Sequence, residues 1–242
     1  MENFTATTFG ERFAEIYDKG PERADTAATV AFLEQLAGGG PALELAIGTG
    51  RVALPLAARG VHVDGVDISP EMVAKLRAKP GGDQISVTMG DFADVPVQGN
   101  YRLVFVVFNT LFNLVTQQDQ VRCFQNVAAH LTDDGLFVVE AFVPDPKRFR
   151  DGQYVDAEAV GVDEVWLDVC RHDVVAQRLD EVHVSLSARG VRLYPVVLRY
   201  AWPSELDLMA RIAGLRLKER WAGWEREPFT STSSTHVSVY GR

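Results

Sequence analysis

The stretch Glu44-Leu45-Ala46-Ile47-Gly48-Thr49-Gly50 decides the fold of this chain. It predicts a strand over residues 42–47 that runs into a tight Gly-x-Gly turn, followed by a helix over residues 51–59. The two glycines let the backbone adopt conformations that other residues avoid, and let it approach a ligand closely. We therefore expect a strand–turn–helix unit with a binding site at the end of the strand.

Alternating strands and helices continue on both sides of this unit. The pattern predicts strands over 61–68, 84–89, 102–108 and 135–142, and helices over 70–78 and 117–131. Two helices precede it, one over 8–19 and one that Pro21 opens. A helix near 204–213 and two strands, 215–224 and 235–240, follow later. Alternating βα units indicate a doubly wound α/β fold with a mostly parallel sheet and helices on both faces.

Residues 153–202 break this alternation. Val165, Leu167 and Val169 alternate with polar residues, as do Val182, Val184 and Leu186, and no helical period is present. This pattern is typical of an antiparallel β meander. We expect residues 1–152 and 203–242 to form the ligand-binding domain and 153–202 to form an inserted β lid over the active site. The lid is also a candidate surface for a homodimer.

Composition excludes several classes of partner. The formal net charge is -9 and the sequence pI is about 5.1, so a phosphate backbone would be repelled and we expect no nucleic acid partner. The longest apolar run, 103–108, is too short to cross a bilayer, so we expect no membrane partner. No signal peptide precedes the fold, which favours a cytoplasmic protein. The two cysteines, Cys123 and Cys170, have no metal-ligand spacing, and we expect no metal.

Three acidic positions bear on the cofactor. Glu44 precedes Gly48 by four residues; an acid there would crowd a pyrophosphate but suits the cationic end of S-adenosyl-L-methionine (SAM). Asp67 ends the next strand, where a carboxylate can accept both ribose hydroxyls of either a dinucleotide or SAM. Asp91, in Gly90-Asp91-Phe92 after the third strand, can accept from an adenine amino group with Phe92 beside the ring.

These motifs together resemble the class I SAM-dependent methyltransferases. The matching residues are Glu44-x-x-x-Gly48-x-Gly50, Val66-Asp67-Ile68-Ser69, Gly90-Asp91-Phe92, and Leu131-Thr132-Asp133-Asp134-Gly135, in which Asp-Asp-Gly replaces a more usual Pro-Gly-Gly. The resemblance covers about residues 8–142 and 203–242. It implies a seven-stranded sheet whose last two strands form an antiparallel pair.

The resemblance also implies a set of residues that contact SAM and its product, S-adenosyl-L-homocysteine (SAH). These are Tyr17, Glu44, Ala46, Gly48, Gly50, Asp67, Ile68, Asp91, Phe92, Phe108 and Asn109. Tyr17 resembles an aromatic residue that some relatives fold over the methyl donor. The β insertion resembles that of small-molecule methyltransferases, including those that act on nucleotide-linked aminosugars.

The expected topology places two segments that carry no cofactor motif at the acceptor end of the site. Strand 135–142 should end where the SAM-binding strands end, and the loop before the last strand should lie at the same edge. We therefore expect Glu140 and His236 to line the acceptor pocket. In this hypothesis Glu140 orients the acceptor, and His236 is the general base because its ordinary pKa is near neutral.

The sequence thus predicts methyl transfer to an N or O atom of a small-molecule acceptor, a specialised metabolite. Two alternatives stay open. An NAD(P)-dependent oxidoreductase shares the Gly-x-Gly turn and the ribose acid, and Gly48-x-Gly50-x-x-Ala53 fits its fingerprint. Glu44, Gly90-Asp91-Phe92 and the terminal hairpin disfavour it. A SAM-binding regulatory module without catalysis is the other, and turnover of SAM would distinguish it.

Overall fold

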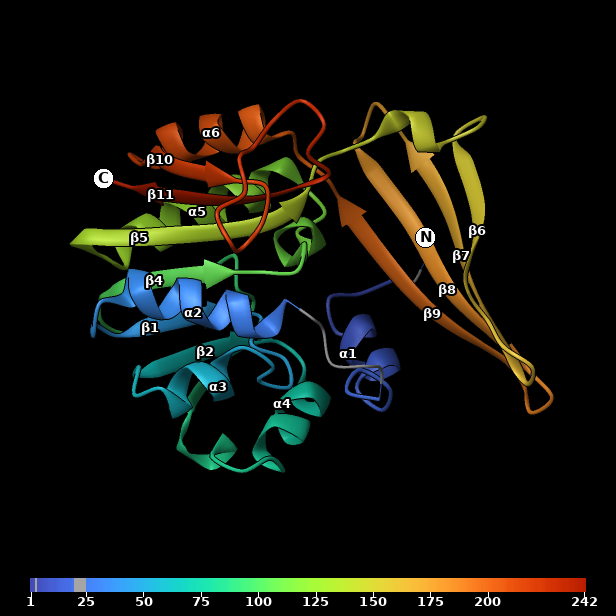
Figure 1. Cartoon of the computed structure of the whole chain (residues 1–242), viewed down its shortest axis with the longest axis horizontal. Helices are drawn as coiled ribbons and strands as arrows, with labels where there is room; N and C mark the ends of the chain where they lie inside the picture. The colour runs from blue at the N-terminus through green and yellow to red at the C-terminus, as the bar shows by residue number, and fades with distance from the viewer. Residues whose placement is uncertain (3, 20–24) are drawn as a thin grey trace.

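The structure, a computed structural model, describes residues 1–2, 4–19 and 25–242, so the predicted helix start at Pro21 lies outside the described residues. Two sheets stand side by side (Figure 1). The larger has seven strands in the order β10-β11-β5-β4-β1-β2-β3. The smaller has four strands in the order β6-β7-β8-β9.

The elements follow the predicted order closely. The strands of the larger sheet are β1 Ala42–Leu45, β2 Val63–Asp67, β3 Ser86–Met89, β4 Tyr101–Val106, β5 Leu131–Phe142, β10 Arg216–Trp221 and β11 Thr235–Gly241. The α-helices are α1 Thr8–Phe13, α2 Thr26–Ala37, α3 Ala53–Ala58, α4 Pro70–Arg77, α5 Gln117–Ala129 and α6 Pro203–Ile212. Short 3-10 turns are η1 Gly82–Gln84, η2 Thr110–Asn113 and η3 Pro146–Arg148.

Apolar side chains cover both faces of the larger sheet, as a doubly wound fold requires. On one face Leu33 of α2 and Leu56 of α3 pack against the strands, and on the other Phe124 of α5 and Leu206 of α6 do so. The inner strands β1 and β4 are almost entirely buried, which explains their continuous apolar runs. The predicted fold class is confirmed.

The last two strands form the antiparallel pair that the resemblance implies. Strand β11 pairs antiparallel with both β10 and β5, whereas β5 pairs parallel with β4. The carboxyl ends of β5 and β10 therefore lie at the same edge of the sheet as those of β1, β2 and β4.

Two predicted boundaries are wrong. Strand β5 begins at Leu131, so residues 131–134 belong to a strand and not to a helix end and turn; Leu131 pairs with Tyr101, and the register shifts before Leu103. Helix α1 ends at Phe13, and the next residues turn because Ile16 and Tyr17 both donate their backbone N–H to the Phe13 carbonyl.

The inserted meander is β6 Gln153–Val160, β7 Glu164–Asp173, β8 Arg178–Ser187 and β9 Gly190–Arg199, each antiparallel to the next. We call this sheet the lid. It leans over the edge where the parallel strands end (Figure 1). Leu198, Tyr200 and Ala201 lie in the same core as Phe112 and Leu206, so the lid packs onto the larger sheet. Among the described residues, no helix is long and apolar enough to cross a membrane.

Candidate active site

The site lies at the topological switch point of the larger sheet. The chain passes from β1 outward to β2 and β3 and then crosses to β4 on the other side of β1. Ligands of open α/β sheets bind outside the carboxyl ends of the strands at this point. Three non-glycine residues here have left-handed φ angles: Ala46 at 54°, Phe108 at 62° and Asn109 at 60°. Such backbone strain concentrates at ligand sites.

Asp67 ties the Gly-x-Gly loop to the end of β2. Its Oδ2 accepts the backbone N–H of Gly48 at 2.6 Å, and its Oδ1 accepts that of Ser69 at 2.8 Å. Burial raises the pKa of Asp67, while these backbone donors lower it. Gly48 and Gly50 have φ angles of 56° and 77°, in the left-handed region that favours glycine. The half-buried Ile68 follows Asp67.

Glu44 places a buried carboxyl group beneath this loop. It is 4% exposed, and its Oε2 has no hydrogen-bond partner among the described residues. Burial raises the pKa of Glu44 to about 8, while the charge of Arg51 opposes the shift. A buried carboxyl oxygen left unsatisfied is costly unless a donor or a cation completes it. The cationic end of SAM supplies both, so the residues present fit this cofactor.

The N-terminal segment covers the Gly-x-Gly loop. Asp18 accepts a hydrogen bond from the Thr49 hydroxyl at 2.8 Å and pairs with Lys79 Nζ at 2.8 Å. Gly10 of α1 approaches Ser69 so closely that a Cβ there would lie 2.0 Å from the Ser69 hydroxyl. Tyr17 directly precedes Asp18, and its ring lies 6.1 Å from that of Phe9 in α1; its role over the methyl donor stays a prediction.

The ends of β4 and β5 are clamped together. Asn109 Oδ1 accepts the backbone N–H of Phe142 at 2.7 Å, and the Glu140 carboxylate accepts the backbone N–H of Phe108. The Arg51 guanidinium lies 5.3 Å from the centroid of the Phe108 ring. Phe108 and Asn109 are thereby fixed in their strained conformation at the end of β4, next to the loop of Gly48.

The residues after β3 make local contacts. Asp91 Oδ1 accepts the backbone N–H of Ala93 at 2.8 Å, and Arg122 lies 3.8 Å from its other oxygen. Phe92 is 9% exposed and packs into the core between the sheet and α5. Both follow β3, the edge strand beside β2, so they lie on the side of the crevice where the Asp67 carboxylate is.

Glu140 and His236 reach the predicted edge but not one pocket. Their segments converge, because Thr235 pairs with Phe142 and the Val143 N–H donates to the Ser234 carbonyl at 2.7 Å. However, His236 pairs with Ala141, whereas Glu140 pairs with Val237. Side chains of successive strand residues point to opposite faces of a sheet. The expectation that both side chains line the same pocket is therefore wrong.

His236 lies in a buried polar cluster beneath α6. It is 0% exposed, its Nδ1 is 2.9 Å from the Ser238 hydroxyl, and its Nε2 has no partner among the described residues. Burial and, after it, the charge of Arg220 together lower the pKa of His236 to about 3. The ring is thus neutral at cellular pH, but it is a much weaker base than the histidine that the sequence alone predicts.

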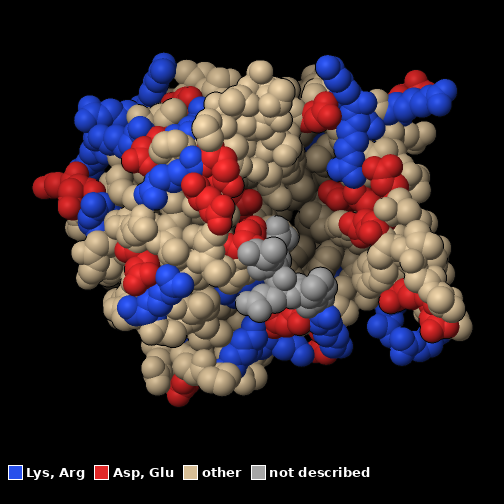
Figure 2. Space-filling model, in the orientation of Figure 1, with Lys and Arg blue, Asp and Glu red and all other residues tan. Residues whose placement is uncertain are grey.

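A cavity of about 310 Å³ opens between the larger sheet and the lid. Asn109 and Phe142 line it from the sheet, Arg148 and Phe149 from the connection, and Tyr154, His172, Glu181 and Tyr200 from the lid. Figure 2 shows the hollow between the two bodies, with acidic side chains on the lid side of its rim. His172 Nε2 lies 2.9 Å from the Tyr200 hydroxyl.

The sequence predictions did not include these lid residues as site residues. The alternation of residues along each strand could have identified them, because every second residue of a strand faces the same side of the sheet. Asp168, Cys170 and His172 in β7 share one face, and Glu181 and His183 in β8 share it too.

Comparisons with known proteins identify the family. Residues 42–135 match the family model described as a methyltransferase domain. The chain is 26% identical to the cypemycin N-terminal methyltransferase of a Streptomyces species over 204 residues, which is 83% of this chain and 82% of that protein. It is 41% identical to the CcbJ methyltransferase of Streptomyces caelestis, with a TM-score of 0.93 over 98% of this chain and 99% of that one.

A further solved structure is CalS10 of Micromonospora echinaspora, an amino pentose methyltransferase with SAM bound. It shares the fold at a TM-score of 0.69 and 21% identity, over 99% of each chain. The chain belongs to the class I SAM-dependent methyltransferases. It is an enzyme whose cofactor is SAM, and it carries a β lid beside the switch point.

Proposed function

We propose that this enzyme transfers the methyl group of SAM to an N or O atom of a small-molecule acceptor, a specialised metabolite, that binds under the lid. The observation that carries the proposal is the cavity itself. Asn109, which follows β4 at the switch point, and His172 and Glu181 of the lid line the same space. In this proposal residues 153–202 act as the lid domain. The cytoplasmic location, the homodimer and the absence of a nucleic acid partner remain predictions.

In the proposed mechanism, the main role of the protein is to bind and orient SAM and the acceptor. Bound SAM supplies a sulfonium methyl group that is already electrophilic. Glu44 would hold the cationic end of SAM and Asp67 its ribose, while Asn109 and Phe108 would flank its methionine part. The lid then aligns the acceptor with the methyl group and excludes water, which is where most of the rate gain of such a reaction arises.

The cofactor assignment predicts a thermal shift. SAH at one hundred times its dissociation constant should stabilise the fold by about 2.7 kcal/mol. For a chain of this length the melting temperature should rise by roughly 5–10 °C. NADH at the same concentration is the control and should cause no shift. Differential scanning fluorimetry checks this, and a shift with NADH but none with SAH would contradict the assignment of Glu44 and Asp67.

Replacement of His236 by asparagine separates a catalytic role from a structural one. If His236 is the base, turnover should fall about 100-fold while SAM affinity is unchanged. We expect instead that turnover persists and that stability falls by about 1–3 kcal/mol, because the ring is buried and bonded to Ser238. Single-turnover kinetics with any methylated acceptor and thermal unfolding measure the two effects.

The same variant has a pH signature. The pKa of His236 is lower in the folded protein than its ordinary value of 6.5. The unfolded chain therefore binds more protons in acid, and the stability that the neutral ring provides is fully present above pH 6.5 and is lost as the pH falls toward 3. His236→Asn should lose less stability over this range than the wild type. Equal acid sensitivity of the two proteins would contradict the burial argument.

A further inference from the structure

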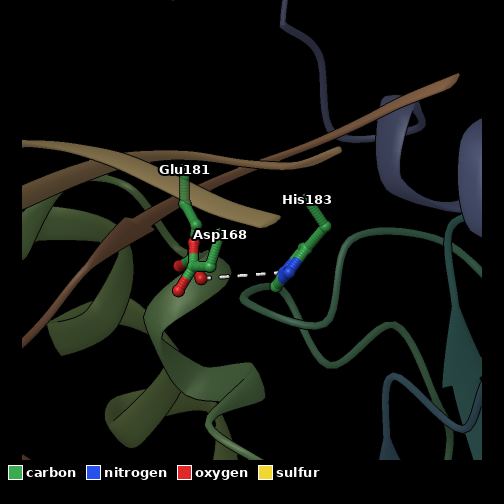
Figure 3. Close-up of side chains that lie close together, drawn as sticks. All are labelled: Asp168, Glu181 and His183. Carbon is green, nitrogen blue, oxygen red and sulfur yellow. Dashed lines mark ion pairs between the residues drawn. The ribbon is translucent and has the colours of Figure 1, made fainter. Parts of the chain in front are cut away.

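Three titratable side chains meet on the inner face of the lid. Asp168 of β7 pairs across the strands with His183 of β8, and Glu181 lies two residues before His183 on the same face. One donor atom from each lies within 4.8 Å of the others, and Figure 3 shows the two carboxylates side by side with the His183 ring turned toward them. Glu181 also lines the cavity under the lid.

Only one of the two carboxylate oxygens of Asp168 has hydrogen-bond partners among the described residues. Its residue is 4% exposed, and its Oδ2 accepts from the Tyr154 hydroxyl at 2.6 Å and from Arg148 at 3.1 Å. Its Oδ1 is buried in the cluster and has no hydrogen-bond partner among the described residues. A buried carboxylate oxygen without a partner requires a proton or a cation nearby.

Negative charge exceeds positive charge around the cluster. The titratable and charged groups that face it are Tyr154, Asp156 and Glu158 from β6, Asp168, Cys170 and His172 from β7, Glu181 and His183 from β8, Tyr194 from β9, and Arg148 from η3. Arg148 alone bridges Asp156 and Asp168, and His183 Nδ1 lies 2.9 Å from Glu158. Burial and, after it, the charge of Asp168 together raise the pKa of Glu181 to about 8, against the opposing charge of Arg148. Four carboxyl groups, those of Asp156, Glu158, Asp168 and Glu181, thus surround one guanidinium, that of Arg148, and this excess of acidic groups favours the binding of a cation.

We propose that this cluster is the subsite for the acceptor's amine, which binds as an ammonium ion and gives its proton to Glu181. The inference rests on the proposed function and narrows its acceptor to a primary or secondary amine. The proton moves from R–NH3+ to the Glu181 carboxylate, leaving R–NH2 with a free electron pair. That pair forms the new C–N bond while the S–CH3 bond breaks and leaves its electrons on sulfur, giving R–NH2+–CH3 and SAH.

Asp168 is the positioning residue of this arrangement. When Glu181 carries the proton, its hydroxyl has the open Oδ1 of Asp168 as acceptor, so the proton stays on the lid and not on the amine. A divalent metal suits the cluster less well, because Arg148 lies 3.1 Å from Asp168 and repels a doubly charged ion more strongly than a singly charged ammonium ion. The raised pKa of Glu181 matches proton exchange with an amine near neutral pH.

The test uses Glu181→Gln, which keeps the shape but cannot take a proton. The full-length enzyme with SAM is incubated with primary and secondary amines and with alcohols of the same carbon skeleton, cyclohexylamine and cyclohexanol being the simplest pair. Mass spectrometry records the gain of one methyl group. We expect methylated amines, and a fall in kcat/KM of about 100-fold in the variant. Asp163→Asn, which removes an exposed lid carboxylate, is the matched control and should change nothing.

Two further measurements keep the outcomes distinct. The thermal shift with SAH should be equal in the wild type and in Glu181→Gln, which shows that the variant folds. The kcat/KM of the wild type should fall below about pH 8, and this limb should flatten in the variant. Asp168→Asn should displace the same limb toward lower pH, because it removes the charge that raises the pKa of Glu181.

Several results would overturn the inference. Methylation of the alcohols in place of the amines, or wild-type kcat/KM for amines in Glu181→Gln, would leave the proposed function standing without this subsite. Stabilisation of the wild type but not of the variant by Mg²⁺, Mn²⁺ or Zn²⁺ alone would make the cluster a metal site. No methylated product from any small molecule, with SAH still bound, would overturn the proposed function itself.

Discussion

Replacing Asp67 by alanine should weaken SAM binding by about 2–4 kcal/mol, which is roughly a 30- to 1000-fold rise in Kd. The variant loses the acceptor for the ribose hydroxyls. It also loses the hydrogen bonds to the N–H groups of Gly48 and Ser69, which order the loop that SAM binds. Hydrogen bonds to a charged group are each worth about 1.5–3 kcal/mol. Isothermal titration calorimetry with SAM and SAH measures the change.

A matched control exists on the same strand. Asp64 lies at the opposite end of β2 from the ligand edge, and its carboxylate accepts the Tyr101 hydroxyl at 2.9 Å. Asp64→Ala should therefore leave the Kd of SAM within about twofold of wild type. If Asp67→Ala binds SAM as tightly as Asp64→Ala does, Asp67 is not a cofactor residue.

Replacing Arg199 by alanine should destabilise the fold by about 3–5 kcal/mol, because it leaves a charged partner uncompensated. Arg199 ends β9 and is 6% exposed. Its guanidinium donates to Gln120 of α5 at 2.6 Å, to Gln177 of the β7–β8 turn at 3.0 Å and to Glu205 of α6 at 2.8 Å. One side chain therefore joins the lid to both helices beneath it.

The melting temperature of Arg199→Ala should fall by roughly 6–20 °C. Arg189→Ala is the control, because Arg189 lies exposed in the β8–β9 turn and its loss should change the melting temperature by less than about 2 °C. Scanning calorimetry of both variants without ligand makes the comparison. Similar melting temperatures for the two variants would show that the lid is not anchored through Arg199.

The sequence was sufficient for the larger sheet because its signals are local. Gly48, Gly50 and Asp67 could be identified as site residues because each lies at or just after the end of a predicted strand, and all three lie at the switch point. Strand β5 was misplaced at its start because residues 132–134 are polar, and only the pairing of Leu131 with Tyr101 shows that the strand begins earlier.

The acceptor side of the site was less predictable because it depends on which face of the sheet each side chain points to. Topology correctly placed the end of β5 beside the start of β11, but a register offset of one residue sends the side chains of Glu140 and His236 to opposite faces of the sheet. The burial that lowers the pKa of His236 comes from helix packing that no local pattern records. The lid residues Asp168 and Glu181 come together only through strand pairing between β7 and β8.

The position of β11 has a consequence for how the protein is made. Residues 235–241 form a strand that sits between β5 and β10, so nearly a hundred residues separate β5 from the partner that covers its outer side. A ribosome delivers the chain from its N-terminus, and domains fold as their segments emerge. The sheet therefore cannot close until residue 241 has been synthesised, and until then β5 presents an unpaired edge that a chaperone or another nascent chain can reach.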